Sequence, residues 1–458
     1  MRAKNSKNSN FNPFRYKDLN ELKQEFQNLK IELPFDLETD ILKTPLNLKE
    51  LFVPNRLTIQ PMEGFDANLN GSPGELTFRR YRKYAQGGAG LIWFEATSIS
   101  DKAKSNSHQL AINKDNLDKF NRFVKEIKNE GNETLKSLGF SNDLICILQL
   151  NHSGRYTKIN GKKFPLRAYE DHELDSTLNV APKKGKIISD EELQNLEDIW
   201  VDRAILAEQA GFDGVDIKAC HGYLISELLR ARRRKDSNYG GKTLRNRSRF
   251  FLNIIKKLNK KIDKENFLIT TRLSIYNGRE YPNSFGVDKE SKQIPPKEDL
   301  TEPLELIREL SKLDVHLINI SMGNPHFKPF ITRPYDIPAI KGTIPPEHPL
   351  KSVYRLVNLT SKIKKLIPQR MKIIGSGYSY LRQFSAYLTA GLIRNKKVDL
   401  CGFGRMAFAN PSFPKQIFIN EEINKKKVCI TCSKCSALMR EGKKTGCVIR
   451  DPLYNPKN

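Results

Sequence analysis

Three reactive side chains lie close together near the middle of the sequence. Lys218, His221 and Tyr223 follow directly after an apolar run at residues 212–217. The run predicts a buried strand, and the residues from Leu224 onward predict a helix. Polar side chains at the C-terminal end of a strand are where a (β/α)8 barrel holds its chemistry. We therefore expect these three side chains to line an active site.

Four cysteines near the C-terminus form a second group that could do chemistry. Cys429, Cys432 and Cys435 have the spacing C-x2-C-x2-C, and Cys447 follows them. Disulfide frameworks usually occur in short secreted chains with cysteines spread throughout, which is not the pattern here. Four thiolates suit an iron–sulfur cluster, and they also suit tetrahedral zinc. The spacing therefore predicts a metal or cluster site.

Apolar runs that alternate with amphipathic segments must position these residues. Such alternation predicts an α/β fold, here a (β/α)8 TIM barrel. Among the helices, residues 190–210 have the clearest periodicity, with Asp190 as the expected N-cap. The eight expected strands lie at residues 55–62, 90–96, 144–150, 212–217, 267–274, 315–321, 371–377 and 398–405.

The segments outside the strands and helices divide the chain into three parts. We expect an N-terminal extension at residues 1–50, with one short helix at 19–31 that packs outside the barrel. The barrel should occupy residues 51–422, and a Cys-rich appendage residues 423–458. Residues 156–188 are polar and should form an irregular loop above the site, where a substrate cap would lie.

The chain is strongly basic, with a formal net charge of +26. The basic residues are scattered and accompany no nucleic-acid motif, so we interpret them as solvated surface rather than as a nucleic-acid interface. A denser cluster at residues 232–235 lies beside the expected site and suits steering of an anionic substrate. The sequence contains neither a secretory signal nor an apolar run of about 18 residues. These features predict a cytoplasmic protein without a membrane partner; its oligomeric state stays open.

The segment around Tyr223 resembles the signature of the old yellow enzyme family, the flavin-dependent ene-reductases. The shared features are a polar pair at 218 and 221, Gly222-Tyr223-Leu224, Tyr239-Gly240-Gly241 and Asn246-Arg247-Ser248-Arg249-Phe250. Lys218 departs from the usual histidine of the pair. Matching motifs occur in order from Asn55 to Cys447, and this length makes the resemblance specific.

The resemblance implies a bound FMN. A glutamine on the third strand would bond the flavin pyrimidine, with His152 nearby as an accessory residue. An arginine on the fifth strand would stabilise the negative charge of reduced flavin. The turns after strands seven and eight would hold the phosphate. The expected FMN-binding residues are Pro61, Met62, Thr97, Gln149, Arg272, Gly375, Ser376, Gly377, Gly404 and Arg405.

The implied activity is NAD(P)H-linked reduction of the C=C bond of an α,β-unsaturated carbonyl compound. Lys218 and His221 would stabilise charge on the carbonyl oxygen, and Tyr223 would protonate the α-carbon. The Lys218 ammonium predicts a preference for an enone that carries a carboxylate. Two alternatives remain: a flavin and iron–sulfur dehydrogenase that oxidises an amine or C–H substrate, and a non-catalytic basic binding protein on a barrel scaffold.

The cysteine run is similar to that of the family branch with 2,4-dienoyl-CoA reductase and trimethylamine dehydrogenase. Members of this branch hold a [4Fe-4S] cluster, so the resemblance favours a cluster over zinc. The FAD and NAD(P)H domains that follow the cluster in that branch have no counterpart in these 458 residues. We therefore expect either direct reduction of FMN by NAD(P)H or a separate electron-donor protein.

Overall fold

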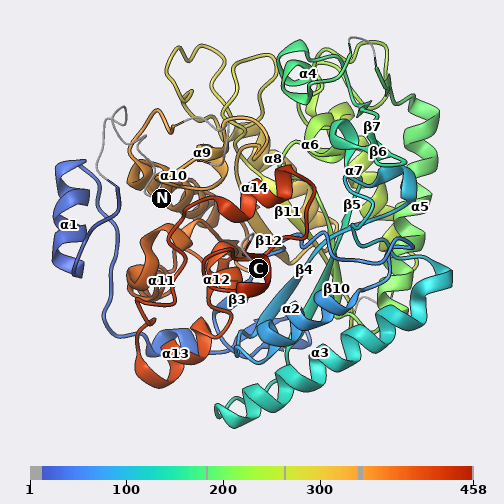
Figure 1. Cartoon of the computed structure of the whole chain (residues 1–458). Coiled ribbons are helices and arrows are strands. Elements are labelled where there is room, and N and C mark those ends of the chain that lie inside the picture. Colours follow the sequence, from blue (N-terminus) through green and yellow to red (C-terminus); the bar gives the residue numbers. More distant parts are fainter. Residues whose placement is uncertain (1–12, 182–183, 263–264, 339–343, 456–458) are drawn as a thin grey trace.

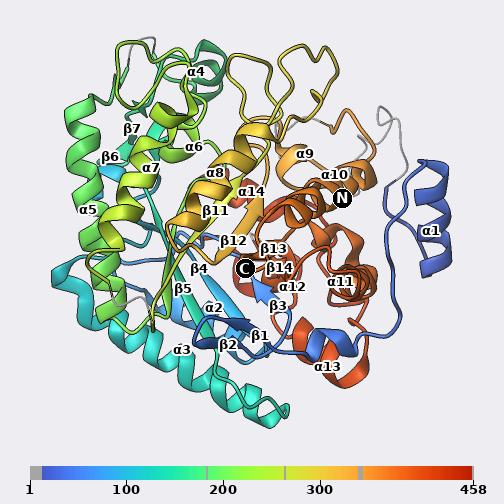
Figure 2. The same cartoon turned by 180° about the vertical axis from the view of Figure 1, so that it is seen from behind.

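The computed structural model describes residues 13–181, 184–262, 265–338 and 344–455. Eight parallel strands close into a barrel, which confirms the expected (β/α)8 fold (Figures 1 and 2). In order around the barrel, the strands are β3 (Leu57–Ile59), β4 (Leu91–Ser98), β5 (Ile145–Asn151), β10 (Gly214–Ile217), β11 (Leu268–Ser274), β12 (Leu317–Ser321), β13 (Lys372–Gly375) and β14 (Leu400–Phe403).

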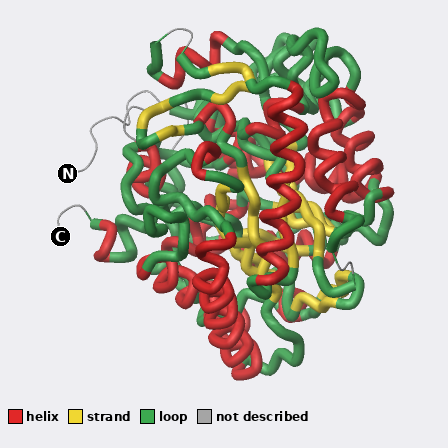
Figure 3. Tube along the Cα trace, turned by 90° about the vertical axis from the view of Figure 1, so that its right-hand side faces the viewer, coloured by secondary structure: helices red, strands yellow, loops and turns green. Residues whose placement is uncertain are grey.

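Helices follow the strands and cover the outside of the barrel (Figure 3). Each turns an apolar stripe inward; in α3, for example, Phe120, Phe123 and Ile127 are buried at helical spacing. The main helices are α2 (Glu75–Ala85), α3 (Leu117–Ser137), α5 (Asp190–Gln209), α7 (Leu244–Leu258), α8 (Thr301–Lys312), α10 (Pro349–Leu366), α11 (Ser385–Arg394) and α13 (Phe413–Asn420). Shorter ones are α6 (Leu224–Leu228), α9 (Pro329–Thr332) and α12 (Arg405–Ala409), with 3-10 turns at Asp40–Lys43, Asp101–Ala103, Lys114–Asn116 and Tyr378–Phe384. No helix of the described residues is both long and apolar enough to span a membrane.

A hairpin closes the N-terminal end of the barrel. Its strands, β1 (Leu46–Leu48) and β2 (Leu51–Val53), pair in antiparallel fashion. Leu46, Leu48 and Val53 pack against residues that fill the barrel interior, including Trp93. The hairpin crosses the expected boundary at residue 50, so the barrel's core begins before that point.

The N-terminal segment runs along the outside of the barrel, as expected. Its helix α1 (Leu19–Asn28) lies beside α10 and α11 (Figure 1). Leu22 and Phe26 on one face of α1 are buried in the outer hydrophobic core. Residues 1–12 of the expected extension lie outside the described residues.

The expected irregular loop at 156–188 proves to be a cap with short regular elements. They are β6 (Lys158–Ile159), β7 (Lys162–Lys163), β8 (Leu166–Arg167), α4 (His172–Leu178) and β9 (Lys186–Ile187), preceded by a 3-10 turn at Gly154–Tyr156. Arg155 anchors this cap: its guanidinium binds Glu227 and Asp175, and Nη2 donates to the Tyr169 carbonyl at 2.7 Å. β6 and β7 form a local hairpin, whereas β8 pairs with β9 about twenty residues further along the chain, so local periodicity could not predict the cap as a whole.

The start of α5 differs from the prediction. Ser189, not Asp190, is the N-cap: its hydroxyl accepts from the Glu192 N–H, and the Glu192 carboxylate accepts from the Ser189 N–H. This reciprocal pair is a capping box. Asp190 instead binds Arg234 at 2.7 Å and the N–H of Asn238 at 2.7 Å. It therefore ties α5 to the basic loop after β10.

The Cys-rich appendage packs against the barrel rather than extending from it. It contains α14 (Lys434–Arg440) and a 3-10 turn at Pro452–Tyr454. The N–H of Thr445 donates to the Gly64 carbonyl at 2.7 Å, and Arg79 binds Asp451 at 2.7 Å. The appendage therefore contacts the segment that follows the first barrel strand.

Candidate active site at the C-terminal end of the barrel

Lys218 is a buried cation directly after β10. Its Nζ lies 4.0 Å from the centre of the Tyr223 ring. No carboxylate of the described residues forms an ion pair with it within 4.0 Å. Glu63, which follows Pro61 and Met62, is the nearby acid: burial raises the pKa of its carboxyl, and the Lys218 charge lowers it. The ammonium thus faces the aromatic side of the site and can still accept an anionic partner.

His221 has a backbone conformation that only a few non-glycine residues adopt. Its φ of 64° lies in the left-handed region, a strain that commonly marks functional sites. Its N–H donates to the Ser274 hydroxyl at 3.1 Å, and Nε2 lies 2.7 Å from the Ser321 hydroxyl. Burial, Arg272 and Lys218 lower the pKa of His221 well below its usual 6.5. His221 is therefore a neutral imidazole at pH 7, and Lys218 carries the charge of the pair.

Tyr223 has the features of a protected proton donor. Its side chain is 5% exposed, and its hydroxyl makes no hydrogen bond to the described residues. Burial and then Glu63 raise the pKa of Tyr223 well above 10. Tyr156 and His326 stand edge-on to its ring, with centroids at 5.7 and 6.0 Å. The hydroxyl therefore stays protonated, and its ring position is fixed by neighbours.

Arg272 on β11 is a buried guanidinium without the usual partners. Its Nε has no hydrogen-bond partner in the described part of the chain, and burial lowers its pKa. Leaving a buried donor unpaired costs about 1–3 kcal/mol. Such a donor fits an acceptor that a bound cofactor supplies, which is the role expected of Arg272 toward reduced flavin.

A buried carboxylate beneath these residues was missed by the sequence analysis. Asp216 on β10 accepts from Trp93 Nε1 at 2.7 Å, Gln149 Nε2 at 2.5 Å and the Arg272 N–H at 2.7 Å. Burial raises its pKa to about 6. Asp216 therefore fixes Gln149 and ties β4, β5, β10 and β11 together. A charged residue within an apolar strand, the signal that identified Arg272, could have identified Asp216 as well.

The end of the first strand is held by a buried ion pair. Pro61 and Met62 are half-buried, as residues facing a ligand would be. Arg80 Nη1 donates to the Met62 carbonyl at 3.3 Å, and Arg80 binds Glu95 at 2.6 Å. Glu95 also accepts from the Gly64 N–H at 2.8 Å. Thr97, two residues further along β4, is buried, and its hydroxyl donates to the Glu95 carbonyl at 3.1 Å.

The turns after β13 and β14 have the backbone of a phosphate site. Gly377 has a φ of 101°, which strongly favours glycine. A Cβ on Gly375 would lie 2.1 Å from the Tyr378 hydroxyl, so this turn admits no side chain there. The Ser376 hydroxyl donates to the Ile320 carbonyl at 3.1 Å, and Gly404 is half-buried beside Met62. The main chain of these turns can thus approach a phosphate closely.

Several other predicted residues have different surroundings from those expected. His152 is buried, and its Nδ1 accepts from the Gly154 N–H at 3.0 Å, so its role is to shape the turn after β5. In the basic cluster, Arg232 binds Glu302, and Arg234 binds Asp190. These two arginines therefore hold the fold together, and Arg233 and Lys235 are the exposed members of the cluster.

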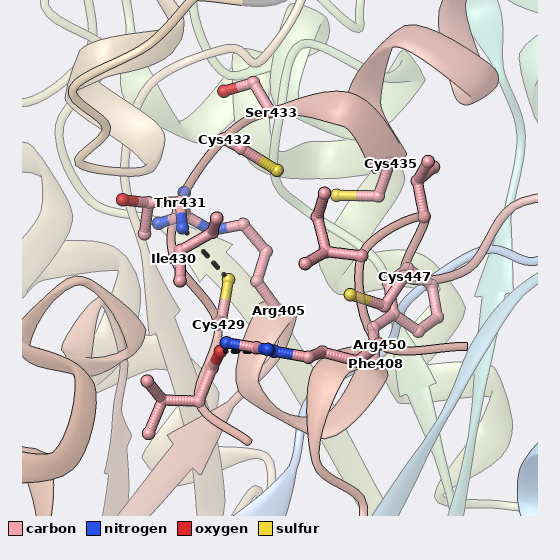
Figure 4. A pocket seen from close by; sticks show the side chains of 13 residues that line it. Arg405, Phe408, Cys429, Ile430, Thr431, Cys432, Ser433, Cys435, Cys447 and Arg450 are labelled. Carbon is pink, nitrogen blue, oxygen red and sulfur yellow. Dashed lines mark hydrogen bonds between the residues drawn. The ribbon is translucent and has the colours of Figure 1, made fainter. Parts of the chain in front are cut away.

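The four cysteines surround one cavity (Figure 4). The four sulfurs point toward the centre of this cavity. Among the described residues, no three His, Cys, Asp or Glu side chains are placed to hold a single metal ion. The Thr431 N–H donates to Cys429 Sγ at 3.4 Å. Burial raises the pKa of the Cys429 thiol to about 12, an effect that the Arg405 charge opposes.

Comparison with known proteins identifies the class of this barrel. Residues 42–294, more than half of the chain, match the NADH:flavin oxidoreductase / NADH oxidase family. The chain therefore belongs to this family of flavin oxidoreductases. FMN and NAD(P)H are the cofactors that the family implies, and the unpaired Arg272 and the glycine turns fit a bound FMN.

Individual relatives agree with this assignment. The chain is 25% identical over 388 residues to an NADPH dehydrogenase of Bacillus pumilus, covering 83% of this chain and 94% of the relative. It is 24% identical over 424 residues to a cinnamate reductase of Clostridium sporogenes, covering 89% and 57%. A 2-naphthoyl-CoA reductase complex has a similar fold, with a TM-score of 0.69 and 17% identity over 91% of this chain and 58% of that one. The chain spans about half the length of several curated relatives that it matches.

Proposed function

We propose that the protein is an FMN-dependent reductase of the C=C bond of α,β-unsaturated carbonyl compounds, with NAD(P)H as the source of electrons. The observation that carries this proposal is the placement of Lys218, His221 and Tyr223 around one barrel mouth, next to Arg272. The naming of a relative for the reduction of cinnamate, an α,β-unsaturated carboxylate, supports the reaction class.

The residues of the chain divide the work of this reaction. When bound, FMN supplies the hydride for the β-carbon. Arg272, with its unpaired Nε, would stabilise negative charge on the reduced flavin. Lys218 and the neutral His221 would donate to the carbonyl oxygen as it gains charge. Tyr223, whose hydroxyl stays protonated, would then give its proton to the α-carbon.

The substrate we propose carries a carboxylate or develops enolate character. Lys218 is a buried ammonium without an ion pair among the described residues, and it occupies a place where the family usually has histidine. Because the imidazole of His221 is neutral, the site's positive charge comes from Lys218 and Arg272. An anionic substrate would balance that charge.

A stopped-flow comparison of wild type and Tyr223→Phe tests the proposal. The variant should reduce FMN with NAD(P)H at the wild-type rate, because Tyr223 takes no part in that half-reaction. Reoxidation by cinnamate or a cyclic enone should slow by about 10²-fold or more, since a general acid contributes about 10²–10⁴-fold. Equal slowing of both half-reactions would remove Tyr223 from the donor role. Bleaching of the flavin by a substrate amine without NAD(P)H would instead favour an oxidative function.

We further propose that the cysteines at 429, 432, 435 and 447 hold a [4Fe-4S] cluster. Zinc–sulfur bonds of about 2.3 Å require four sulfurs that converge on one ion. The C-x2-C-x2-C spacing and the shared cavity that the four cysteines line support a cluster. Iron and zinc analysis of anaerobically purified protein tests this: about four irons per chain are expected. Zinc without iron would make the appendage structural. We propose that the electrons come either from NAD(P)H by direct reduction of FMN or from a separate protein that feeds the cluster.

A further inference from the structure

Two arginines without carboxylate partners among the described residues line the cysteine cavity. They are Arg405 and Arg450, and no Asp or Glu of the described chain lines it. We propose that Arg405 and Arg333 tune the cysteine-held cluster toward its reduced state. This inference rests on the proposed cluster, and it concerns the surroundings of the cysteines rather than the cysteines themselves.

Of the two arginines, Arg405 lies directly at the wall of the cysteine cavity. It begins α12, directly after β14, and its side chain is among those that line the cavity beside Cys429 (Figure 4). The residue is 7% exposed. Its Nη2 donates to the Pro334 carbonyl at 2.7 Å, whereas the buried Nη1 has no partner in the described chain. A full positive charge with a free donor is thus held at the cavity wall.

Arg333 approaches the cysteine loop from another element, the end of α9. Its Nη1 donates to the hydroxyl of Ser433, which lies between Cys432 and Cys435, at 3.3 Å. Its guanidinium is 5.2 Å from the Tyr335 ring centre, and the described residues offer it no ion pair. Burial and then Arg405 lower the pKa of Arg333 to about 10, so it remains charged at pH 7. The two arginines therefore act on the same small region.

Charge balance gives these arginines a redox role. Four thiolates make the site anionic, and when a cluster accepts one electron the site gains one further negative charge. Positive charges fixed nearby in a low dielectric stabilise that reduced state more than the oxidised one. A zinc ion would accept no electron, so no such effect would exist. The electron comes from NAD(P)H by way of FMN, or from the titrating reductant in the experiment below.

Arg405 lies between the expected phosphate turn and the cysteine cavity. The sequence analysis assigned Arg405 to the FMN phosphate. In the structure, Gly404 lies beside Met62 in the turn that is expected to hold the phosphate, and the Arg405 side chain lines the cysteine cavity. A main-chain contact with the phosphate at this turn is therefore compatible with an effect of the Arg405 side chain on the cluster.

The test is a potentiometric titration of the cluster, followed by electron paramagnetic resonance, on the FMN-loaded protein. Arg405→Gln and Arg333→Gln should each shift the reduction equilibrium about tenfold toward the oxidised cluster, which is about 59 mV for a one-electron couple. Arg405→Lys, which keeps the charge, should shift it less than Arg405→Gln does. Lys444→Gln serves as the control, because this exposed lysine of the appendage is screened by solvent and should leave the potential unchanged.

Two further measurements on the same samples separate the outcomes. FMN and iron contents should stay at wild-type levels in both glutamine variants. Full iron content with a potential equal to that of the Lys444 control would overturn the inference, and loss of FMN with an unmoved potential would return Arg405 to a phosphate role and overturn it too. If wild-type protein contains no iron, the proposed cluster itself fails. Should Arg405→Gln fail to fold, Arg333→Gln, in which a half-buried side chain is changed, decides the question alone.

Discussion

At the scale of single residues, Lys218 sets this site apart from the pattern its sequence resembles. The buried ammonium lies over Tyr223 and next to a neutral His221. A fixed cation can orient an anionic group that an imidazole would only hydrogen-bond. Specificity should therefore depend on residue 218 more than on residue 221.

Replacing Lys218 by methionine keeps its length and removes its charge. We expect kcat/KM for cinnamate to fall about tenfold further than kcat/KM for a neutral cyclic enone, since one charge-assisted contact contributes about 1.5–3 kcal/mol. Steady-state kinetics with both substrates measure this difference. Lys136→Met, which alters an exposed lysine in the last turn of α3 on the outside of the barrel, should change neither value by more than about twofold. An equal loss for both substrates in Lys218→Met would contradict the role in selectivity.

His152 should give the fold a pH dependence that Asp216 masks. Burial lowers the pKa of His152 to about 4, so only the unfolded chain takes up this proton between pH 6.5 and 4, and stability falls on acidification. Asp216, with its pKa raised to about 6, binds a proton in the folded state first, so its contribution rises as pH falls from 6 to 3.8. The two terms oppose each other in the same pH window.

His152→Asn removes the contribution of His152 to the pH dependence of stability and leaves that of Asp216. The destabilisation that it causes, measured by urea unfolding, should be about 2–3 kcal/mol smaller at pH 4.5 than at pH 6.5, at 1.36 kcal/mol per pH unit. Asparagine can still accept from the Gly154 N–H, which limits the structural change. A difference between variant and wild type that stays constant across this pH range would show that His152 takes up its proton equally well in the folded chain.

At the scale of elements, prediction succeeded where local pattern decides structure. The barrel strands are mostly apolar runs because both faces of each strand are buried. Each strand begins and ends within three residues of its predicted bounds. The position of the candidate active site could also be predicted from these strands, since parallel strands bring their C-terminal ends to one edge. The cap was missed because ion pairs across long sequence separations hold it, such as Arg155 with Glu227. Gln149 was predicted to face the flavin, but its partner Asp216 could not be read from spacing alone.

The cap should open when its central ion pair is removed. Arg279 is 2% exposed and binds Asp171, the N-cap of α4, as well as Glu173. Although burial favours the neutral acid, the bonds and charge of Arg279 hold the pKa of Asp171 below its usual range. Arg279→Met should therefore leave a buried carboxylate uncompensated, which typically costs about 3–5 kcal/mol.

The consequence for the cap can be measured by limited proteolysis. We expect trypsin to cleave Arg279→Met within residues 158–186 at least tenfold faster than wild type. The FMN content should be unchanged, because the loss of the ion pair destabilises only the cap. Lys289→Met, an exposed change in the same loop, is the matched control. Equal cleavage rates in both variants would mean that other contacts, such as those of Arg155, are sufficient to keep the cap closed.

At the scale of the whole molecule, the barrel end carries two sites that share a wall. The segment from Gly64 and the turn at Gly404 border the expected flavin site, and both also contact the appendage or lead into its cavity. The compositional charge of +26 did not predict this arrangement; the cationic groups that matter here are buried arginines, which a count of basic residues cannot distinguish from surface lysines.

The closure of the barrel has a consequence for the order of synthesis. β3 pairs with β4 on one side and with β14 on the other, through Leu57 and Cys401, and these partners are separated by most of the chain. While the ribosome makes the residues between them, β3 has one unpaired edge of the kind that invites wrong pairing. The hairpin at Leu46–Val53 can cover the base of this strand early, but its open edge waits for the last strand. The expected flavin site is thus completed only after Phe403 has emerged, so nascent chains that stall earlier are the ones a chaperone must shelter.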